Sequence, residues 1–222
     1  MKNALVIGAN GTIGTEIAAQ LENTHSVYKL TQNDTDYSES SLISIAKEMR
    51  SFGDLERIIC CVGVLHNSTV SPEKRLSQLN QEALEEYFRI NTIIPALCIR
   101  AFSPLLSKQH KSKFIVLSAM VGSISDNKLG GWYGYRSSKA ALNMMIKTAS
   151  IELSRTNKNL SICAIHPGTT QGNLSKPFAA GVAKDKYYTP EQSARRIIEI
   201  IDNLEPSRTG QFLNWDGSEI SW

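Results

Sequence analysis

No apolar stretch of this 222-residue sequence approaches the roughly 20 residues that a membrane-spanning helix needs. Charge of one sign is also scarce: a formal net charge of +3, spread along the chain, indicates neither a nucleic-acid partner nor a membrane partner. The chain has no internal repeat, low-complexity tract or linker, so we expect one domain over residues 1–222.

Cysteine is sparse as well, and the four cysteines lack the spacing of metal ligands. They lie in apolar sequence, which is typical of reduced thiols buried in a cytoplasmic protein. We therefore expect no metal site, a cytoplasmic location, and four core thiols: Cys60, Cys61, Cys98 and Cys163.

The start of the chain predicts a nucleotide site. Residues 1–8 share features with a signal peptide, but their apolar part is short and runs into a glycine turn, which favours a buried strand. Apolar residues then recur at helical spacing. Strand, glycine turn and helix bring backbone N–H groups to a dinucleotide pyrophosphate, although a tight turn without a ligand has the same pattern. The residues expected to contact the cofactor here are Gly8, Asn10, Gly11, Thr12, Ile13 and Gly14.

The end of the second predicted strand, residues 27–30, bears on which dinucleotide binds. An acidic residue there hydrogen-bonds the ribose of NAD, and a basic residue suits the phosphate of NADP. Thr31, Gln32 and Asn33 occupy that place, and none is acidic. The sequence therefore favours NADP without excluding NAD.

Residues 36–38 are predicted to form a short strand edge beside this site. Asp36 there either accepts a hydrogen bond from the adenine amino group or caps the helix that begins near Ser40. We expect Asp36 and Tyr37 to contact the cofactor.

A buried strand is predicted over residues 58–63, and a helix start with proline in its first turn over residues 71–74. The helical pattern of residues 84–99 then contains Asn91 and Pro95. Proline lacks the N–H that would bond the carbonyl of residue 91, so we expect a kink and a free carbonyl. That carbonyl either holds an ordered water beside an active site or belongs to a kink with a packing role only.

The chemistry is centred on Tyr135 and Lys139, which lie one helical turn apart and on one face. An ammonium near a phenol favours the phenolate, so we expect Lys139 to lower the pKa of Tyr135 and fit it for proton transfer to or from a carbinol oxygen. Ser118 ends a core strand over residues 114–117, at the edge where ligands of open α/β sheets gather.

The remaining chain completes the pattern. A strand over residues 160–165 is followed by a segment without clear period, residues 169–188, which we interpret as a mobile lid. A capping box over residues 189–192 begins a helix, and residues 211–213 form a closing strand. Alternating strands and helices predict an α/β fold with one doubly wound parallel sheet, a Rossmann fold.

Over nearly its whole length the sequence resembles the short-chain dehydrogenase/reductase family. The resemblance is carried by the glycine turn at residues 8–14, Asn91, Ser118, the Tyr-x-x-x-Lys pattern at 135–139 and a Pro-Gly pair at 167–168. The run from Gly122 to Asn143 is most similar to C-factor-like and Sniffer-type carbonyl reductases.

The resemblance implies roles for individual residues. Tyr135 is the general acid/base, Lys139 lowers its pKa and holds the nicotinamide ribose, Ser118 orients the substrate carbonyl, and Asn91 anchors a water linked to Lys139. The other cofactor contacts expected are Cys61, Val62, Gly63, Pro167, Gly168, Thr169 and Thr170.

The sequence also departs from the family pattern. Thr12 stands where the main branch has a further glycine, and Cys60-Cys61-Val62-Gly63 replaces Asn-Asn-Ala-Gly. The segment between the serine and the tyrosine is longer than usual. Counting back from Gly122 places the family serine on Ala119, so Ser118 is assigned as the end of the strand, with Ser123 as the alternative. Tyr133 competes with Tyr135 but has no lysine four residues on.

These observations predict hydride transfer between NADP(H) and a carbonyl or secondary alcohol. The alternative is a C-factor-like signalling or redox-sensing protein whose turnover is vestigial. We expect a small-molecule substrate in a partly aromatic pocket, structural roles for His66 and His166, and a homodimer through apolar helices. The pocket residues are Leu129, Trp132, Phe178, Tyr187 and Tyr188.

Overall fold

The computed structural model describes residues 2–181 and 183–222. Met1 and Val182, which fall within the predicted N-terminal strand region and the predicted lid, lie outside the described residues. The strands are β1 Lys2–Ile7, β2 His25–Leu30, β3 Leu55–Cys60, β4 Ser112–Leu117, β5 Leu160–Ile165, β6 Thr169–Thr170, β7 Tyr187–Tyr188 and β8 Phe212–Leu213. The α-helices are α1 Thr12–Leu21, α2 Glu39–Met49, α3 Gln81–Phe88, α4 Ile94–Phe102, α5 Tyr133–Thr156 and α6 Pro190–Asp202.

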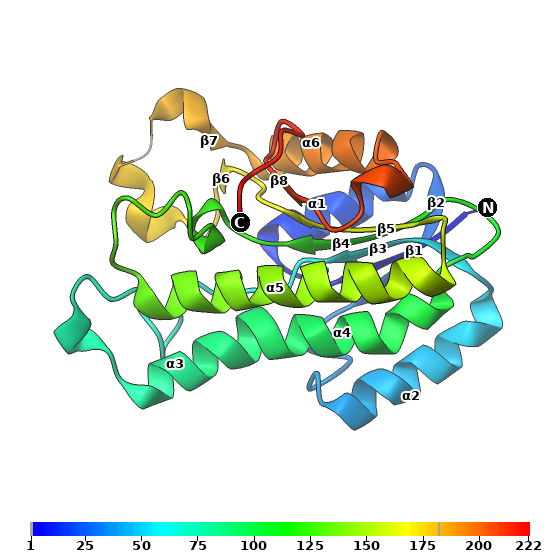
Figure 1. The fold of residues 1–222 in the computed structure, drawn as a ribbon, viewed down its shortest axis with the longest axis horizontal. Coiled ribbons are helices and arrows are strands. Elements are labelled where there is room, and N and C mark those ends of the chain that lie inside the picture. The colour runs from blue at the N-terminus through cyan, green and yellow to red at the C-terminus, as the bar shows by residue number, and fades with distance from the viewer. Residues whose placement is uncertain (1, 182) are drawn as a thin grey trace.

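Six strands form one parallel sheet in the order β2-β1-β3-β4-β5-β8. The core strands are short apolar runs, and β4 and β5 are buried throughout, as expected where helices cover both faces of a sheet. Helices α1 and α6 lie on one face, and α2, α4 and α5 lie on the other (Figure 1). This arrangement confirms the predicted doubly wound fold.

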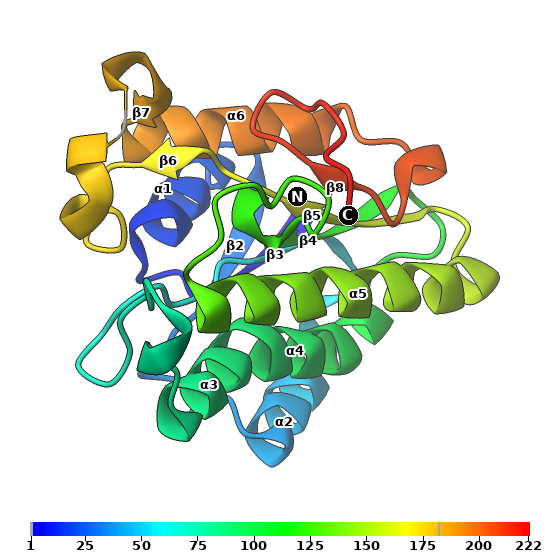
Figure 2. The same cartoon turned by 60° about the vertical axis from the view of Figure 1, so that its left-hand side comes forward.

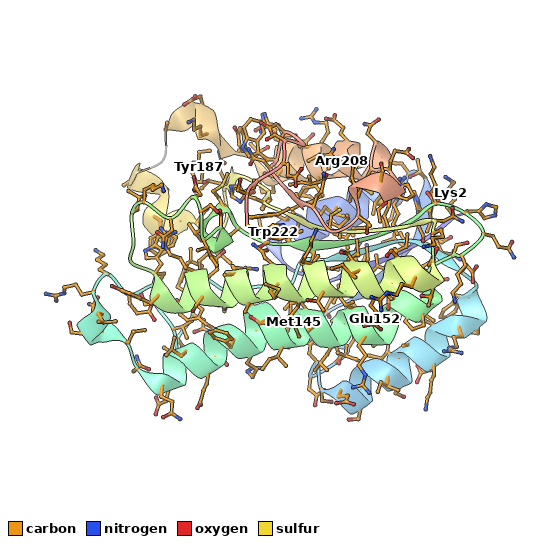
Figure 3. All side chains as sticks on the ribbon, in the orientation of Figure 1. Lys2, Met145, Glu152, Tyr187, Arg208 and Trp222 are labelled. Atoms are coloured by element: carbon orange, nitrogen blue, oxygen red, sulfur yellow. The ribbon has the colours of Figure 1, made fainter. Side chains whose placement is uncertain are left out.

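The strand order places the site. The chain goes outward from β1 to β2 and then returns to pair β3 with the other side of β1. Ligands of such sheets bind at this reversal, beyond the carboxyl ends of the strands. In Figure 3, Lys2 marks the amino end of β1 at the right of the view, and Tyr187 lies toward the left.

Two local predictions differ from the structure, and the segment predicted as a lid contains short elements of its own. Residues 36–38 form no strand, because Ser38 instead caps α2 by accepting a hydrogen bond from the backbone of Ser41. Residues 71–74 begin no helix; α3 starts at Gln81, capped by Asn80. The predicted lid contains β6 and β7, which pair in parallel, and a 3-10 helix over Lys176–Gly181 (Figure 2).

The irregularity expected near Pro95 takes the form of a π-helical turn, Arg89–Ile93, between α3 and α4. The N–H of Ile94 donates to the carbonyl of Arg89, one residue farther back than in an α-helix. The capping box of α6 is confirmed, with Thr189 and Gln192 bonding each other's backbone. Within the described residues, no helix has the length and apolar content needed to cross a membrane.

Candidate active site

The turn between β1 and α1 is built for close backbone contact. Gly8 has φ 77°, a left-handed conformation that favours glycine, and a Cβ at Gly14 would overlap the carbonyl oxygen of Gly8. Gly11 caps α1 without a side-chain hydrogen bond. The first N–H groups of α1 therefore have no side-chain acceptor. They lie at the positive end of the helix dipole, an arrangement that suits a bound phosphate.

Two adjoining cavities run along this turn and make one crevice. The first, about 440 Å³, lies toward β2, and the second, about 510 Å³, lies toward α5. Both are lined by Gly11, Cys61 and Gly63. The other predicted cofactor residues that line one or the other are Gly8, Asn10, Thr12, Ile13, Gly14, Asp36, Tyr37, Val62, Tyr135, Pro167, Gly168, Thr169 and Thr170.

The first cavity has few charges. Asp36 lines it and accepts from the backbone N–H of Ser38 at 2.9 Å, which lowers the pKa of the carboxyl. Asp34 folds back onto Thr31, accepting from its N–H at 2.8 Å and its hydroxyl at 2.7 Å. Arg89 is the one lysine or arginine in this lining among the described residues. Of the two roles predicted for Asp36, the helix cap belongs to Ser38 instead.

Tyr135 and Ser118 meet in the second cavity. Tyr135 lies in the first turn of α5, is 7% exposed, and its hydroxyl has no hydrogen-bond partner within the described part of the chain. The hydroxyl of Ser118, just beyond β4, donates to Oδ1 of Asn143 at 2.7 Å. Tyr135 is therefore the hydroxyl with a proton free for a ligand.

The two alternatives that the sequence left open lie elsewhere. The Ser123 hydroxyl donates to the carbonyl of Ser221 at 2.5 Å and accepts from the N–H of Asp126, and it does not line the cavity. Tyr133 is 36% exposed and does not line the cavity either. The geometry therefore favours Ser118 and Tyr135.

Asn91 and Lys139 lie behind the cavity wall, against Gly63. A Cβ at Gly63 would be 3.2 Å from Nζ of Lys139 and 3.4 Å from Oδ1 of Asn91. Nζ of Lys139 donates to the carbonyl of Leu117 at 3.1 Å. The Asn91 amide holds both backbone groups of Val64, and donates to the Ser138 hydroxyl at 3.1 Å. The π-turn thus fixes the loop after β3 to the start of α5.

Burial sets the ionisation of this pair. It raises the pKa of the Tyr135 phenol above its ordinary value and lowers the pKa of Lys139 to about 8. The predicted lowering of the phenol pKa by Lys139 is therefore wrong for this structure. The ammonium is directed at the Leu117 carbonyl, and loss of water around the phenol is the larger effect.

Two residues near the site were not predicted from the sequence. Asn143, the partner of Ser118, continues the four-residue spacing of Tyr135 and Lys139, so that spacing contained a signal for it. Glu73 is 4% exposed, and its carboxylate accepts from the N–H of Gly134 in the first turn of α5 at 3.2 Å. It lies sixty-one positions away in sequence, and no local pattern indicates this contact.

The predicted aromatic pocket is confirmed in part. Trp132 and Phe178 line the second cavity, with ring centroids 5.1 Å apart. Leu129 is 93% exposed, and neither Tyr187 nor Tyr188 lines the cavity. His166, predicted to be structural, does line it.

The remaining polar predictions concern His66 and the thiols. His66 lies outside the second cavity and bonds the carbonyl of Asn173 at 2.9 Å. Cys60, Cys98 and Cys163 are buried free thiols, and Cys61 is half-buried in the crevice. In the part of the chain that the structure describes, no cluster of His, Cys, Asp or Glu is arranged to hold a metal ion.

Comparison with known proteins places this geometry in context. The family model described as short chain dehydrogenase matches residues 31–182. The 1-hydroxy-2-glutathionyl-2-methyl-3-butene dehydrogenase of Rhodococcus sp. (strain AD45) is 35% identical over 159 residues, which cover 72% of this chain and 67% of that protein. C-signal of Myxococcus xanthus is 30% identical over 147 residues, or 66% of this chain and 83% of that protein.

Solved structures share the fold. The carbonyl reductase Sniffer of D. melanogaster has a TM-score of 0.84 at 20% identity, covering 100% of both chains. The NADPH-bound carbonyl reductase from chicken fatty liver has a TM-score of 0.79 at 22% identity, covering 100% of this chain and 99% of the other. At these identities the likeness concerns the fold alone.

Proposed function

Because the chain belongs to the short chain dehydrogenase family, a family of NAD(P)-dependent oxidoreductases, we propose that it transfers a hydride between NADP(H) and a carbonyl or secondary alcohol. The observation that carries this proposal is the unpartnered Tyr135 hydroxyl in a cavity that continues along the glycine turn. NADP is favoured because the end of β2 has no acid aimed at a ribose, and because several proteins of this fold bind NADP(H).

The residues fit such a cofactor. The glycine turn and the N-terminus of α1 would hold the pyrophosphate, and the cavity lined by Asp36 and Tyr37 would hold the adenosine. The segment after β5, residues 167–170, which includes β6, would line the nicotinamide end. The cofactor supplies or accepts the hydride when bound.

The side chains then handle the proton. In reduction, Tyr135 donates its hydroxyl proton to the substrate oxygen, and its raised pKa keeps that proton on the phenol at neutral pH. Ser118 adds a second hydrogen bond when its hydroxyl turns from Asn143 to the substrate. Lys139 and Asn91 hold the wall behind Gly63, and the Lys139 ammonium is our proposed source of a replacement proton.

The experiment is Tyr135→Phe, with Tyr133→Phe as the matched control on the exposed side of the same turn. Loss of one such donor costs on the order of 100- to 1,000-fold in kcat. NADPH oxidation with a panel of aldehydes, ketones and quinones should fall by that factor in Tyr135→Phe only, with the Kd for NADPH unchanged. Ordinary turnover in Tyr135→Phe would contradict the mechanism.

A signalling or redox-sensing role is the second candidate, and the similarity to C-signal favours it. Tight NADPH binding without turnover of any carbonyl in the panel would support that role instead of reduction. The unpartnered Tyr135 hydroxyl supports the enzymatic proposal, since nucleotide sensing alone requires no proton donor in the second cavity.

A homodimer is also proposed. Four apolar side chains are about half exposed or more on the π-turn and α5: Ile93, Met144, Met145 and Ile151. Figure 3 shows Met145 on the side of α5 next to α4. Burial of this surface against a second copy would remove it from water.

A further inference from the structure

We propose that the second cavity selects an uncharged, flat aromatic carbonyl compound, seated against the rings of Trp132 and Phe178. The inference rests on the proposed function and names its substrate class. It is carried by the chemistry of the cavity wall beyond Ser118 and Tyr135. That wall is mainly apolar, and its polar side chains Gln171 and Ser175 are uncharged. The apolar side chains are Leu65, Met120, Val121, Trp132, Leu174 and Phe178.

The wall offers no counterion to a charged substrate. Among the described residues, no Asp, Glu, Lys or Arg side chain lines the cavity. His166 is neutral at physiological pH, because burial lowers its pKa to about 4. The Lys139 ammonium lies behind Gly63 and is bonded to the Leu117 carbonyl. With the N-terminus of α1 taken by the cofactor pyrophosphate, a carboxylate seated against the apolar wall would lose its water without gaining an ion-pair partner.

A neighbouring cavity, unlike the second one as far as the described residues go, is lined by a lysine. It is lined by Lys74 and His66, and it shares Trp132 and Phe178 with the second cavity. The two rings therefore separate an apolar reaction cavity from a polar outer one. We therefore expect only the second cavity, on the inner side of these rings, to reject charged substrates.

The aromatic wall is held in place before a ligand arrives. Trp132 has φ 54°, and its backbone N–H donates to the carbonyl of Glu73 at 2.5 Å. Its ring lies 5.1 Å from that of Phe178 and 6.2 Å from that of Tyr135, centroid to centroid. Aromatic rings favour offset or edge contacts at these separations. A flat ring bearing the carbonyl would extend this cluster on the side of the cavity away from the glycine turn, leaving the glycine-turn side to the cofactor.

The first arm of the test compares 2-naphthaldehyde with 6-formyl-2-naphthoate, which differ by one carboxylate. With NADPH in excess, kcat/KM should be at least about 100-fold higher for the neutral aldehyde, because the carboxylate is buried unpaired. Comparable values for the two aldehydes would overturn the inference and leave carbonyl reduction standing.

The second arm tests the rings. Trp132→Leu should raise the KM for 2-naphthaldehyde about 10-fold, and Trp132→Phe should restore most of the loss, because it keeps an aromatic face. Leu129→Ala is the matched control, since Leu129 is exposed on the same loop and does not line the cavity. Equal KM values in Trp132→Leu and wild type would refute a role for the indole.

A binding measurement separates this inference from the proposed reaction. Calorimetry on the protein with saturating NADP+ would compare 2-naphthylmethanol with 6-(hydroxymethyl)-2-naphthoate. Tighter binding of the neutral alcohol supports the inference even if no aldehyde is reduced, in which case only the proposed reaction fails. Equal binding of both alcohols, or binding of neither, overturns the inference.

Discussion

Lys139 is charged in a place where charge is unfavourable. It is 3% exposed, and burial lowers the pKa of its ammonium from 10.5 to about 8. At and below pH 8 the folded protein therefore keeps a cation that the unfolded chain would hold in water. A buried group with a strongly shifted pKa is typical of functional sites. Such a group predicts that a substitution which removes its charge will increase stability and decrease activity.

Replacing the cation should therefore stabilise the protein while abolishing turnover. Lys139→Met should raise the free energy of unfolding at pH 7 by at most about 3 kcal/mol, less whatever the lost bond to the Leu117 carbonyl contributed. Between pH 8 and 10.5 the unfolded chain binds more protons than the folded one, so wild-type stability rises with pH and the gain shrinks.

Urea unfolding of both proteins from pH 7 to 10.5 checks this prediction, with exposed Lys128→Met as the control. A gain in stability that stays constant over this range would show that packing, and not the buried charge, is responsible.

At the scale of elements, α5 depends on a residue from outside it. Its N-cap residue, Trp132, makes no side-chain cap, and the Glu73 carboxylate accepts from Gly134 instead. Because Tyr135 lies in the same turn, the loop before α3 helps to fix the side chain that we propose as proton donor. Glu73 is thus a positioning residue for Tyr135.

Removing this acceptor should loosen the first turn of α5. We expect Glu73→Ala to lower the free energy of unfolding by about 1–2 kcal/mol and to reduce kcat more than it changes KM. Glu73→Gln keeps an acceptor oxygen and should recover most of both losses. Exposed Glu48→Ala, on α2, is the control. If Gln behaves like Ala, the charge at the helix end matters more than the hydrogen bond.

The same region shows where sequence reasoning stopped. Apolar spacing predicted α1, α5 and the core strands, because each buries its own periodic face. Residues 71–74 carry a helix-start pattern, yet Glu73 serves the end of a distant helix. The predicted lowering of the Tyr135 pKa was wrong for a related reason. The spacing places Lys139 on the same helix face, but it does not reveal that the ammonium of Lys139 turns to the Leu117 carbonyl. Both the role of Glu73 and the pKa of Tyr135 depend on contacts between segments far apart in sequence.

At the scale of the whole molecule, one helix layer remains partly uncovered. Met144 is 65% exposed and Met145 47% exposed on α5, while the opposite side of that helix packs on the sheet. Isolated exposed apolar residues are ordinary, but these lie close together with Ile151 on one helix.

We therefore expect sedimentation velocity to show a dimer at micromolar concentration. A double variant, Met144→Glu with Met145→Glu, should shift the protein to monomer by placing unpaired charges at the contact. Leu129→Glu alters a still more exposed apolar residue in the loop before α5 and should leave the dimer intact. A wild-type protein that sediments as a monomer at all concentrations would refute the proposal.

The short pairing of β6 with β7 has a consequence for changing the shape of the cavity. It pairs Thr169 with Tyr187 and Thr170 with Tyr188, so that both ends of the intervening segment are anchored beside the crevice. Phe178 lies within that segment, whereas Ser118, Tyr135 and the glycine turn lie outside it. Substitutions confined to the stretch between β6 and β7 should therefore reshape the Phe178 side of the second cavity while leaving Ser118, Tyr135 and the glycine turn unchanged.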